Sequence, residues 1–342
     1  MKVLCLGKLP PPLQERLKTE AKIESVTYVD RAAPLPDPEL TAVLSGIDIV
    51  LSEPQDNLSE NILSRCQALK MVAQRAVGYD NVDLDYCNRS GILLSNTPGV
   101  LDNATADLAF SLLLCAARRI VEADRYVRAG LWHGFESDLL LGREISGKTL
   151  GIVGLGRIGE AMARRAWGFG LKIIYCRSDH KNSGTTEFEL DEKDRRLAQS
   201  LGARRVSMED LLKESDFISL HCPLKKETTN LIGAAELALM KNGCILVNTA
   251  RGKVVEEKAL VEAVTKGKII AALDVFAQEP TVPPPLLNSP NTVLAPHIGS
   301  ATDETRFAMA ELAVNAVLQV LQGGLPANLV NPQIFERTVN KL

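Results

Sequence analysis

The chain has 342 residues, and at roughly 150 residues per domain this length predicts about two domains. Hydrophobic residues make up 46% of the chain and charged residues 24%, which is enough apolar material for two cores and excludes a mainly disordered protein. The formal net charge is −3, so we expect no overall attraction to nucleic acid or to an anionic membrane.

The N-terminus and the cysteines favour a cytoplasmic chain. Residues 1–7 form a short apolar run that Lys8 and Pro10-Pro11-Pro12 interrupt, unlike the apolar core of a secretory signal. The longest apolar stretch, 108–117, is about half the ~20 residues of a membrane span. The seven cysteines are odd in number and dispersed, without a close pair suited to zinc or redox chemistry. We therefore expect no metal site and no membrane segment.

The first hundred residues alternate short apolar runs with amphipathic stretches such as 60–69. The expected strands are 3–6, 26–29, 47–51, 71–73 and 92–95. Their recurrence, about every 20 residues, is typical of a parallel sheet with crossover helices.

A long helical pattern follows from 104 to about 128, and we expect it to bridge two domains and to be buried by both. A second α/β series then has expected strands at 149–153, 172–176, 217–221, 244–248, 269–274 and 292–295. The polar stretch 179–196 is expected to be a solvated loop, and an amphipathic helix from 301 to about 321 to return to the first domain. The predicted domains are 1–100 with 301–342, and 101–300.

A glycine-rich turn, Gly154-Leu155-Gly156-Arg157-Ile158-Gly159, follows the expected strand 149–153 and opens a helical pattern through Trp167. The first glycine allows a tight turn, the second lets the backbone approach a pyrophosphate, and the third lets helix and strand pack closely. The helix N-terminus attracts the anion. Any tight strand-to-helix turn could use such glycines, but the strand–turn–helix context favours a dinucleotide site.

The next strand ends near Arg177-Ser178, where an acidic ribose ligand is expected about 20 residues after the motif. A carboxylate there would repel an adenosine 2′-phosphate, whereas an arginine can hold it. The alternative is an exposed arginine beside a solvated loop. Our hypothesis is that NADP(H) is preferred and that NAD(H) is possible.

Several further residues follow expected strands and would share the sheet edge at which doubly wound folds bind ligands. They are Cys222-Pro223, Thr249-Ala250-Arg251, Asp274 and Pro296-His297.

Among the four histidines, His297 is the best candidate proton carrier. It lies in a stiff turn between Pro296 and Ile298-Gly299-Ser300. A lone histidine at a strand end is more often structural, but the position of His297 on the expected cofactor edge favours a role in proton transfer. Glu279 could hold its imidazole and favour the protonated form, or could be a surface carboxylate before a proline. Arg251 could clamp a substrate carboxylate, or could form a salt bridge at a helix start.

These motifs together resemble the D-isomer-specific 2-hydroxyacid dehydrogenases over nearly the whole chain. The glycine turn, 248–252, 274–280 and 296–300 occur in that family's order and spacing. The resemblance implies that Arg251 binds the substrate carboxylate, that His297 is the acid/base, and that Glu279 is its partner. It also implies Val77 and Gly78 as backbone donors to that carboxylate. The cofactor contacts that it implies are Thr105, Thr228, the Thr249-Ala250 backbone and Asp274, the last to the nicotinamide amide. Cys222, Pro223 and Gly299 are further candidate cofactor contacts, because they lie on or next to the expected cofactor edge.

The resemblance also implies the architecture and the partners. We expect two doubly wound parallel-sheet domains, a flavodoxin-like substrate domain and a Rossmann dinucleotide-binding domain, closing over a cleft in a homodimer. The expected substrate is a small 2-oxo or 2-hydroxy acid, and Arg177 is similar to the arginine of NADPH-using glyoxylate and hydroxypyruvate reductases. Val77 replaces the lysine of phosphite dehydrogenases, so that activity is not expected.

Two questions stay open at this stage. Some relatives sense dinucleotides as corepressors with little turnover, although the complete set of Arg251, Glu279 and His297 favours an enzyme. Trp132 and Phe135 could line the entrance, contact a second copy or pack in a core.

Overall fold

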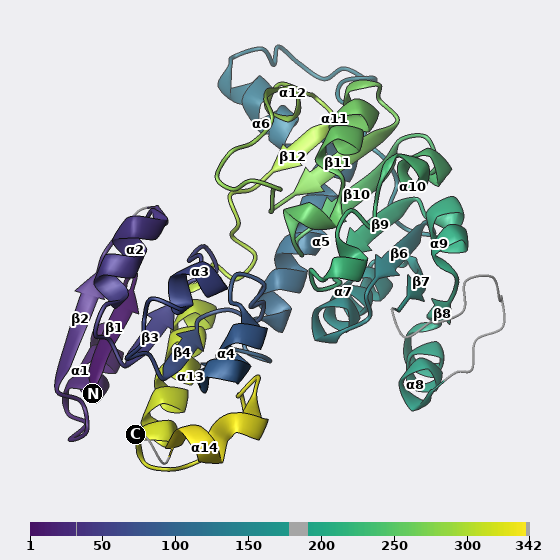
Figure 1. Ribbon diagram of the computed structural model, residues 1–342. Coiled ribbons are helices and arrows are strands. Elements are labelled where there is room, and N and C mark those ends of the chain that lie inside the picture. Colours follow the sequence, from purple (N-terminus) through teal and green to yellow (C-terminus); the bar gives the residue numbers. More distant parts are fainter. Residues whose placement is uncertain (32, 178–190, 340–342) are drawn as a thin grey trace. The chain divides into compact units, whose positions relative to one another are not determined.

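The computed structural model describes residues 1–31, 33–177 and 191–339. The chain divides into unit 1, Met1–Leu101 with Ala301–Leu342, and unit 2, Asp102–Ser300. Each unit contains one parallel sheet with helices on both faces (Figure 1). The expected fold class, two doubly wound α/β sheets, is confirmed.

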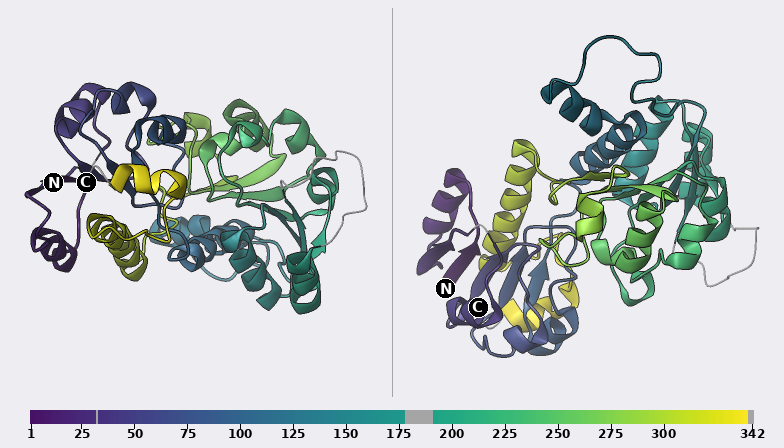
Figure 2. Two further views of the ribbon diagram at one scale, coloured as in Figure 1. Left: turned by 60° about the horizontal axis from the view of Figure 1, so that its bottom comes forward. Right: turned by 90° about the horizontal axis from the view of Figure 1, so that it is seen from above.

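The sheet of unit 1 has the order β2-β1-β3-β4-β5. Its strands are β1 (Lys2–Leu6), β2 (Ser25–Val29), β3 (Ile49–Ser52), β4 (Met71–Gln74) and β5 (Leu93–Ser95). This is the flavodoxin-like order. Helices α1 (Pro11–Lys18) and α13 (Asp303–Leu321) cover one face, and α2 (Asp37–Leu44), α3 (Glu60–Leu63) and α4 (Leu84–Ser90) the other (Figure 2). The C-terminal α14 (Phe335–Val339) follows a short 3₁₀ turn, Pro332–Ile334.

The sheet of unit 2 has the order β12-β11-β10-β9-β6-β7-β8. Its strands are β6 (Thr149–Val153), β7 (Lys172–Cys176), β8 (Arg204–Arg205), β9 (Phe217–Leu220), β10 (Cys244–Asn248), β11 (Ile269–Leu273) and β12 (Thr292–Leu294). The chain runs one way from β6 through β7 to β8 and then returns to β9 on the other side of β6. Ligands bind outside the carboxyl ends of strands at such a switch point.

Two helical layers sandwich this second sheet (Figure 2). The helices α5 (Asp102–Arg118), α7 (Arg157–Gly168) and α8 (Glu192–Leu201) pack on one face. The other face carries α9 (Met208–Glu214), α10 (Ala234–Leu239), α11 (Glu257–Thr265) and α12 (Pro284–Leu287). The 3₁₀ turns Lys226–Thr228 and Gly252–Val254 lie beyond β9 and β10.

The expected strands agree with the structure to within two residues at either end. The short edge strand β8 was missed because two residues carry no periodicity. Helix α3 ends at Leu63, six residues before the expected end at 69.

The expected single helix 104–128 is wrong in one respect, since it consists of α5 and α6 (Ile120–Arg128). Arg119 separates them with φ of +54°, in the left-handed region that interrupts a right-handed helix. Many α5 side chains are buried, but none of α6 is, so the expected burial of the whole stretch is also wrong. Trp132 and Phe135 are 59% and 93% exposed, which excludes packing in a core of this chain.

The expected loop 179–196 is wrong at its C-terminal end; residues 178–190, Ser178 among them, lie outside the described part. Asp191 accepts a hydrogen bond from Asp194 N at 2.9 Å, and the Asp194 carboxylate accepts one from Asp191 N at 3.2 Å. This capping box starts α8 at Glu192. Among its hydrophobic side chains only Leu197 is fully buried, so the helical periodicity was weak.

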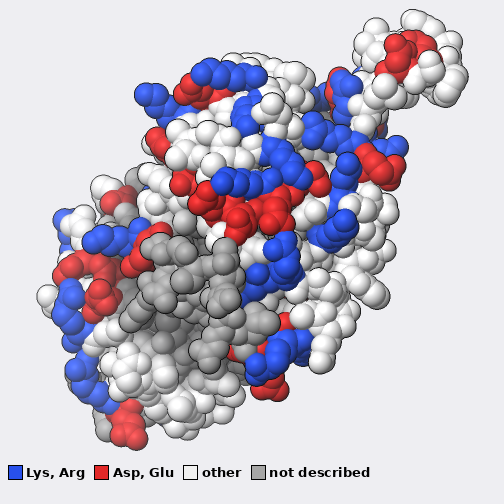
Figure 3. Space-filling model, turned by 90° about the vertical axis from the view of Figure 1, so that its right-hand side faces the viewer, with Lys and Arg blue, Asp and Glu red and all other residues white. Residues whose placement is uncertain are grey.

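The surface shows no dominance of one charge on the face of the molecule in Figure 3, where blue and red side chains are interspersed. No helix in the described ranges combines the length and the apolarity that a membrane crossing requires.

Candidate active site

The glycine turn after β6 has the geometry of a dinucleotide site. Gly154 has φ of +93°, and a Cβ there would lie 2.7 Å from Cys222 N. A Cβ on Gly159 would lie 2.3 Å from Gly154 O, so this glycine allows α7 to pack against the strand. A Cβ on Gly156 would meet no described atom within 4 Å. Packing therefore explains the first and third glycines, and the open space at the second is what a pyrophosphate needs.

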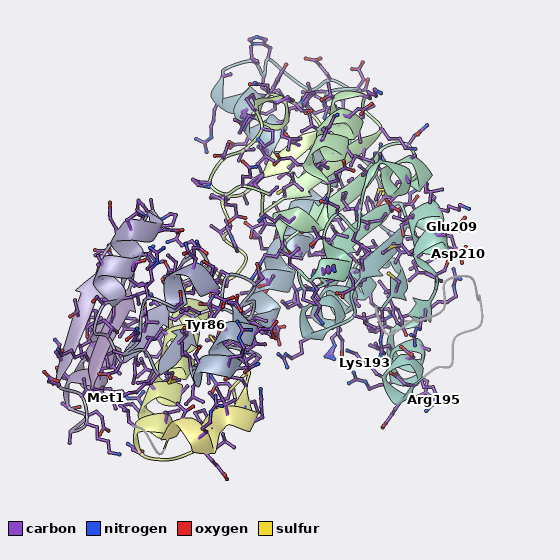
Figure 4. The ribbon with its side chains drawn as sticks, viewed as in Figure 1. Met1, Tyr86, Lys193, Arg195, Glu209 and Asp210 are labelled. Carbon is purple, nitrogen blue, oxygen red and sulfur yellow. The ribbon has the colours of Figure 1, made fainter. Side chains whose placement is uncertain are left out.

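The N-terminus of α7 adds to this fit. No side chain in the described part of the chain caps the helix at Gly156, so the first N–H groups of α7 can bind an anion. Lys193 reaches from α8 toward α7 (Figure 4) and donates to Leu155 O at 2.7 Å. Arg157 pairs with Asp102 at 3.2 Å and stays mostly exposed. The described residues of this turn thus suit a nicotinamide dinucleotide.

Arg177, at the end of β7, is already held by two carboxylates. Its guanidinium donates to Asp194 at 3.1 Å and to Asp191 at 2.9 Å. The buried Asp194 also accepts from Arg205 at 2.7 Å and from Tyr175 at 2.6 Å. The Asp194 N–H and Arg177 together lower the pKa of Asp191 to about 2. Among the described residues, Arg177 and Arg205 therefore lie against the carboxylates of Asp191 and Asp194 at the expected 2′-phosphate position.

In the segments after β9 and β10, several polar groups form hydrogen bonds within the protein itself. Thr228 Oγ1 donates to Pro223 O at 2.6 Å and accepts from Lys225 N at 2.8 Å, so its proton is already used. Thr249 Oγ1 is buried and has no hydrogen-bond partner among the described residues. Ala250 N donates to Asn248 Oδ1 at 3.0 Å. Thr249 is thus the better placed of the two threonines to bind a ligand.

Asp274, after β11, fixes the turn that carries His297. Its two carboxylate oxygens accept from Ile298 N at 2.7 Å and from Gly299 N at 2.8 Å, and its carbonyl accepts from His297 N at 2.8 Å. His297 adopts φ of +56°, a conformation that is rare outside glycine. Thr105 of α5 lies beside the same turn, since a Cβ on Gly299 would be 3.5 Å from its methyl group. Burial raises the pKa of Asp274, although these N–H groups partly offset it.

The imidazole of His297 is paired with Glu279. Nδ1 lies 2.7 Å from Glu279 Oε2, and Glu279 Oε1 accepts from Phe276 N at 3.0 Å. Burial alone would raise the pKa of Glu279, but the bond to His297, the charges of His297 and Arg251, and the Phe276 N–H outweigh burial and lower it. The carboxylate is therefore ionised at neutral pH and can hold the imidazole ring in one orientation.

Arg251 lies at the same edge of unit 2. Its backbone is fixed by Asn248 Nδ2, which donates to Arg251 O at 2.9 Å, and its Nη1 donates to Ala250 O at 2.8 Å. The next residue, Gly252, packs so closely on the loop after β11 that a Cβ would lie 1.9 Å from Phe276 C. This contact brings Arg251 near Glu279, whose pKa it lowers.

Val77 and Gly78 belong to unit 1 and follow β4 at the carboxyl end of its sheet. Ala76 O accepts from Thr97 N at 2.9 Å, and Val77 O accepts from Asn96 Nδ2 at 2.9 Å. Among the described residues, neither the Val77 N–H nor the Gly78 N–H has an acceptor. Both amides thus remain available to an anion.

Sequence reasoning missed four residues that shape these places: Lys193, Asp191, Asp194 and Asn96. The first three lie within the last part of the stretch 179–196, which was expected to be a loop, and the Asp191–Asp194 spacing of a capping box was the available signal. Asn96 lies just after β5, a strand end like those that drew attention in unit 2. The described residues contain no group of three or more His, Cys, Asp or Glu side chains able to hold a metal ion.

Comparison with known proteins places these features in one family. Residues 110–299 match the family model described as D-isomer specific 2-hydroxyacid dehydrogenase, NAD binding domain. The glyoxylate reductase of Thermococcus litoralis is 49% identical over 84% of this chain and 85% of its own.

Two solved structures extend the comparison. The NADPH-dependent glyoxylate/hydroxypyruvate reductase of Sinorhizobium meliloti, in complex with NADP and malonate, is 30% identical with a TM-score of 0.80, covering 98% of each chain. The D-lactate dehydrogenase of Aquifex aeolicus, in complex with NAD and lactic acid, is also 30% identical, with a TM-score of 0.79, over 96% of this chain and 98% of that one. The chain belongs to the D-isomer-specific 2-hydroxyacid dehydrogenases, oxidoreductases that use a nicotinamide dinucleotide.

Proposed function

We propose that this protein reduces a small 2-oxo acid of the glyoxylate or hydroxypyruvate type to a D-2-hydroxy acid, with NADPH preferred and NADH possible. The observation that carries the proposal is the His297–Glu279 pair, with Nδ1 and Oε2 2.7 Å apart, at the dinucleotide edge of unit 2. The names of the similar glyoxylate reductases support this choice of substrate.

Arg251 and the amides of Val77 and Gly78 are assigned to the substrate carboxylate. A guanidinium forms two parallel hydrogen bonds to a carboxylate, and backbone N–H groups add donors without a side-chain entropy cost. A carboxylate that is held in this way orients the 2-oxo group for the reaction.

His297 is assigned the proton transfer. Its Nδ1 is bonded to Glu279, so Nε2 remains to donate a proton to the substrate carbonyl oxygen. The bound dihydronicotinamide supplies the hydride that the carbonyl carbon receives. Negative charge grows on the oxygen as the C–H bond forms, and the imidazolium stabilises this charge more than it stabilises the carbonyl. The proton then completes the hydroxyl group, and Glu279 holds the imidazole in position throughout.

The proposed preference for NADPH rests on Arg177. A 2′-phosphate would compete with Asp191 for the guanidinium, and Asp191 is more exposed than Asp194, with 47% of its side chain accessible against 0%. We therefore propose that Asp191 gives way to the phosphate and thereby moderates the preference, so that NADH remains usable.

We also propose a cytoplasmic homodimer. The seven cysteines are free thiols, and six are buried, which suits a reducing compartment. The segment from α6 to residue 142 stands off from the body of unit 2 (Figure 2). It exposes Ile120, Val127, Leu131, Trp132, Phe135 and Leu141, each by half or more. Monomeric proteins rarely expose so many apolar side chains together. We therefore propose that a second copy of this chain packs against this segment.

The test is a panel of glyoxylate, hydroxypyruvate, pyruvate and bulkier 2-oxo acids, followed by NADPH and NADH oxidation. We expect turnover with the smallest acids and a higher kcat/KM with NADPH. Tight cofactor binding without turnover of any acid would favour the corepressor-like alternative, which the names of the relatives do not support.

A further inference from the structure

We infer that Asn96 is a positioning residue that aims the Gly78 amide at the substrate carboxylate. The inference rests on the proposed function and adds a residue that holds one of its assigned donors. It begins from the 2.9 Å hydrogen bond that Asn96 Nδ2 donates to Val77 O.

The geometry of a peptide group connects this bond to the amide. In a trans peptide the carbonyl and the N–H point in opposite directions, so fixing Val77 O fixes the Gly78 N–H on the other side. The preceding peptide is fixed by the backbone alone, through Thr97 N and Ala76 O at 2.9 Å. Asn96 is therefore the side chain on which the direction of the Gly78 N–H depends.

The following peptide is held in the same sense. Gln74, fully buried at the end of β4, has an amide NH₂ 3.4 Å from Gly78 O and 2.9 Å from Asn81 Oδ1. Ser52 Oγ donates to Gln74 Oε1 at 2.6 Å and so fixes which end of the amide faces the loop. Three consecutive carbonyls, from Ala76 to Gly78, thus point into unit 1. The N–H groups of the same three peptide groups point in the opposite direction, away from the hydrogen bonds that the carbonyls accept.

The backbone of Asn96 is itself clamped, which makes its side chain a rigid support. Asn96 N donates to Asn328 O at 3.2 Å, and Asn328 Nδ2 donates to Asn96 O at 2.7 Å. Asn96 is only partly buried, so its amide can be removed without opening a closed core. Loss of the Nδ2 bond would leave the Val77–Gly78 peptide free to rotate and would weaken carboxylate binding.

The test compares Asn96→Ala and Asn96→Ser with wild type in NADPH-dependent glyoxylate reduction. Oxalate serves as a competitive inhibitor that reports carboxylate binding without turnover. We expect the KM for glyoxylate and the KI for oxalate to rise together by about 10- to 150-fold, as for the loss of one hydrogen bond to a charged group. The kcat should change less than about threefold, and the KM for NADPH should not change, because uniform substrate binding alone is lost.

A matched control separates positioning from stability. Asn331 is a fully buried asparagine of unit 1 that donates to Ile92 O at 2.9 Å and accepts from Leu94 N at 2.8 Å. Asn331→Ala should lower the Tm at least as much as Asn96→Ala and leave the oxalate KI unchanged. If the Asn96→Ala enzyme has the oxalate KI of wild type, the positioning role of Asn96 is overturned and the proposed function is not affected. Absence of 2-oxo acid reduction by wild type would overturn the proposed function and this inference with it.

Discussion

His297 Nδ1 lies 2.7 Å from Glu279 Oε2, while the backbone N–H of His297 is held at 2.8 Å by Asp274 O. One contact orients the imidazole ring, and the other fixes the backbone that carries it. The direction of the Glu279 pKa follows from this pairing and gives the first prediction.

Glu279→Gln should keep the shape of the site and remove the charge. The neutral amide no longer supports the positive charge that the imidazole needs as a proton donor, so the reductive kcat/KM should be lower than that of wild type across the pH range. At neutral pH we expect a loss of about 10- to 100-fold. A pH–rate profile of both enzymes measures this, and superimposable profiles would remove Glu279 from the proposed role.

The same substitution carries a stability prediction with a defined sign. The pKa of Glu279 is lowered in the folded protein, so its charged form stabilises the fold above its ordinary pKa. This contribution is lost as pH falls through the lowered value. Urea unfolding in the acid range should therefore show a smaller pH dependence for Glu279→Gln than for wild type.

Gly156→Ala tests the second glycine of the cofactor turn. A Cβ there meets no described atom within 4 Å, and Gly156 has φ of −78°, which alanine adopts readily. We therefore expect an unchanged Tm together with a KM for NADPH raised about tenfold or more, because the methyl group occupies the space of the pyrophosphate. Gly168→Ala, at the other end of α7 and also in open space, is the matched control and should change neither quantity by much. A Gly156→Ala enzyme with normal cofactor affinity would contradict the assigned pyrophosphate position.

The cofactor preference is tested by two substitutions of opposite sign. Arg177→Asp should lower the NADPH-to-NADH ratio of kcat/KM by about 10-fold or more, since a charge-assisted bond to the phosphate is replaced by repulsion. Asp191→Asn should raise the ratio, because it weakens the carboxylate that competes for Arg177 at 2.9 Å. Steady-state kinetics with both cofactors decides the matter; ratios that do not move would show that specificity lies in other residues.

His221 provides a stability prediction away from the proton-transfer pair. Burial lowers its pKa to about 4, and Ser219 Oγ lies 2.8 Å from its Nε2. The unfolded chain takes up a proton near the ordinary histidine pKa while the folded chain does not, so stability should fall as pH drops from about 6.5 to 4. The effect is at most about 3 kcal/mol and smaller to the extent that solvent reaches the ring. His221→Gln should flatten this loss, whereas the exposed His133→Gln should not; equal losses in all three proteins would exclude His221 as the cause.

Local sequence signals predicted most of the fold. Apart from the two-residue edge strand β8, the strands of both sheets lie in mainly apolar runs, and the spacing of the three glycines predicted the turn between β6 and α7. The interruption at Arg119 was not predictable in this way, because it depends on one residue taking a left-handed conformation inside a continuous helical pattern. The start of α8 was obscured because its charged residues leave little periodicity.

For the candidate site, the sequence alone proposed the residues whose type suggests a chemistry, such as His297, Glu279 and Arg251, and their roles remain proposals. The site was not predictable where the partner is distant in sequence. Asp194 holds Arg177 from 17 residues away, and Asn96 binds Val77 O from 19 residues away. Such pairs depend on which loops the sheet order brings together.

The steady-state rate of His297→Ala with saturating glyoxylate and NADPH tests the central assignment most directly. We predict a fall in kcat of about 10²- to 10⁴-fold with cofactor affinity unchanged, as expected when a general acid is removed. A kcat within about threefold of wild type would contradict the assignment of proton transfer to His297.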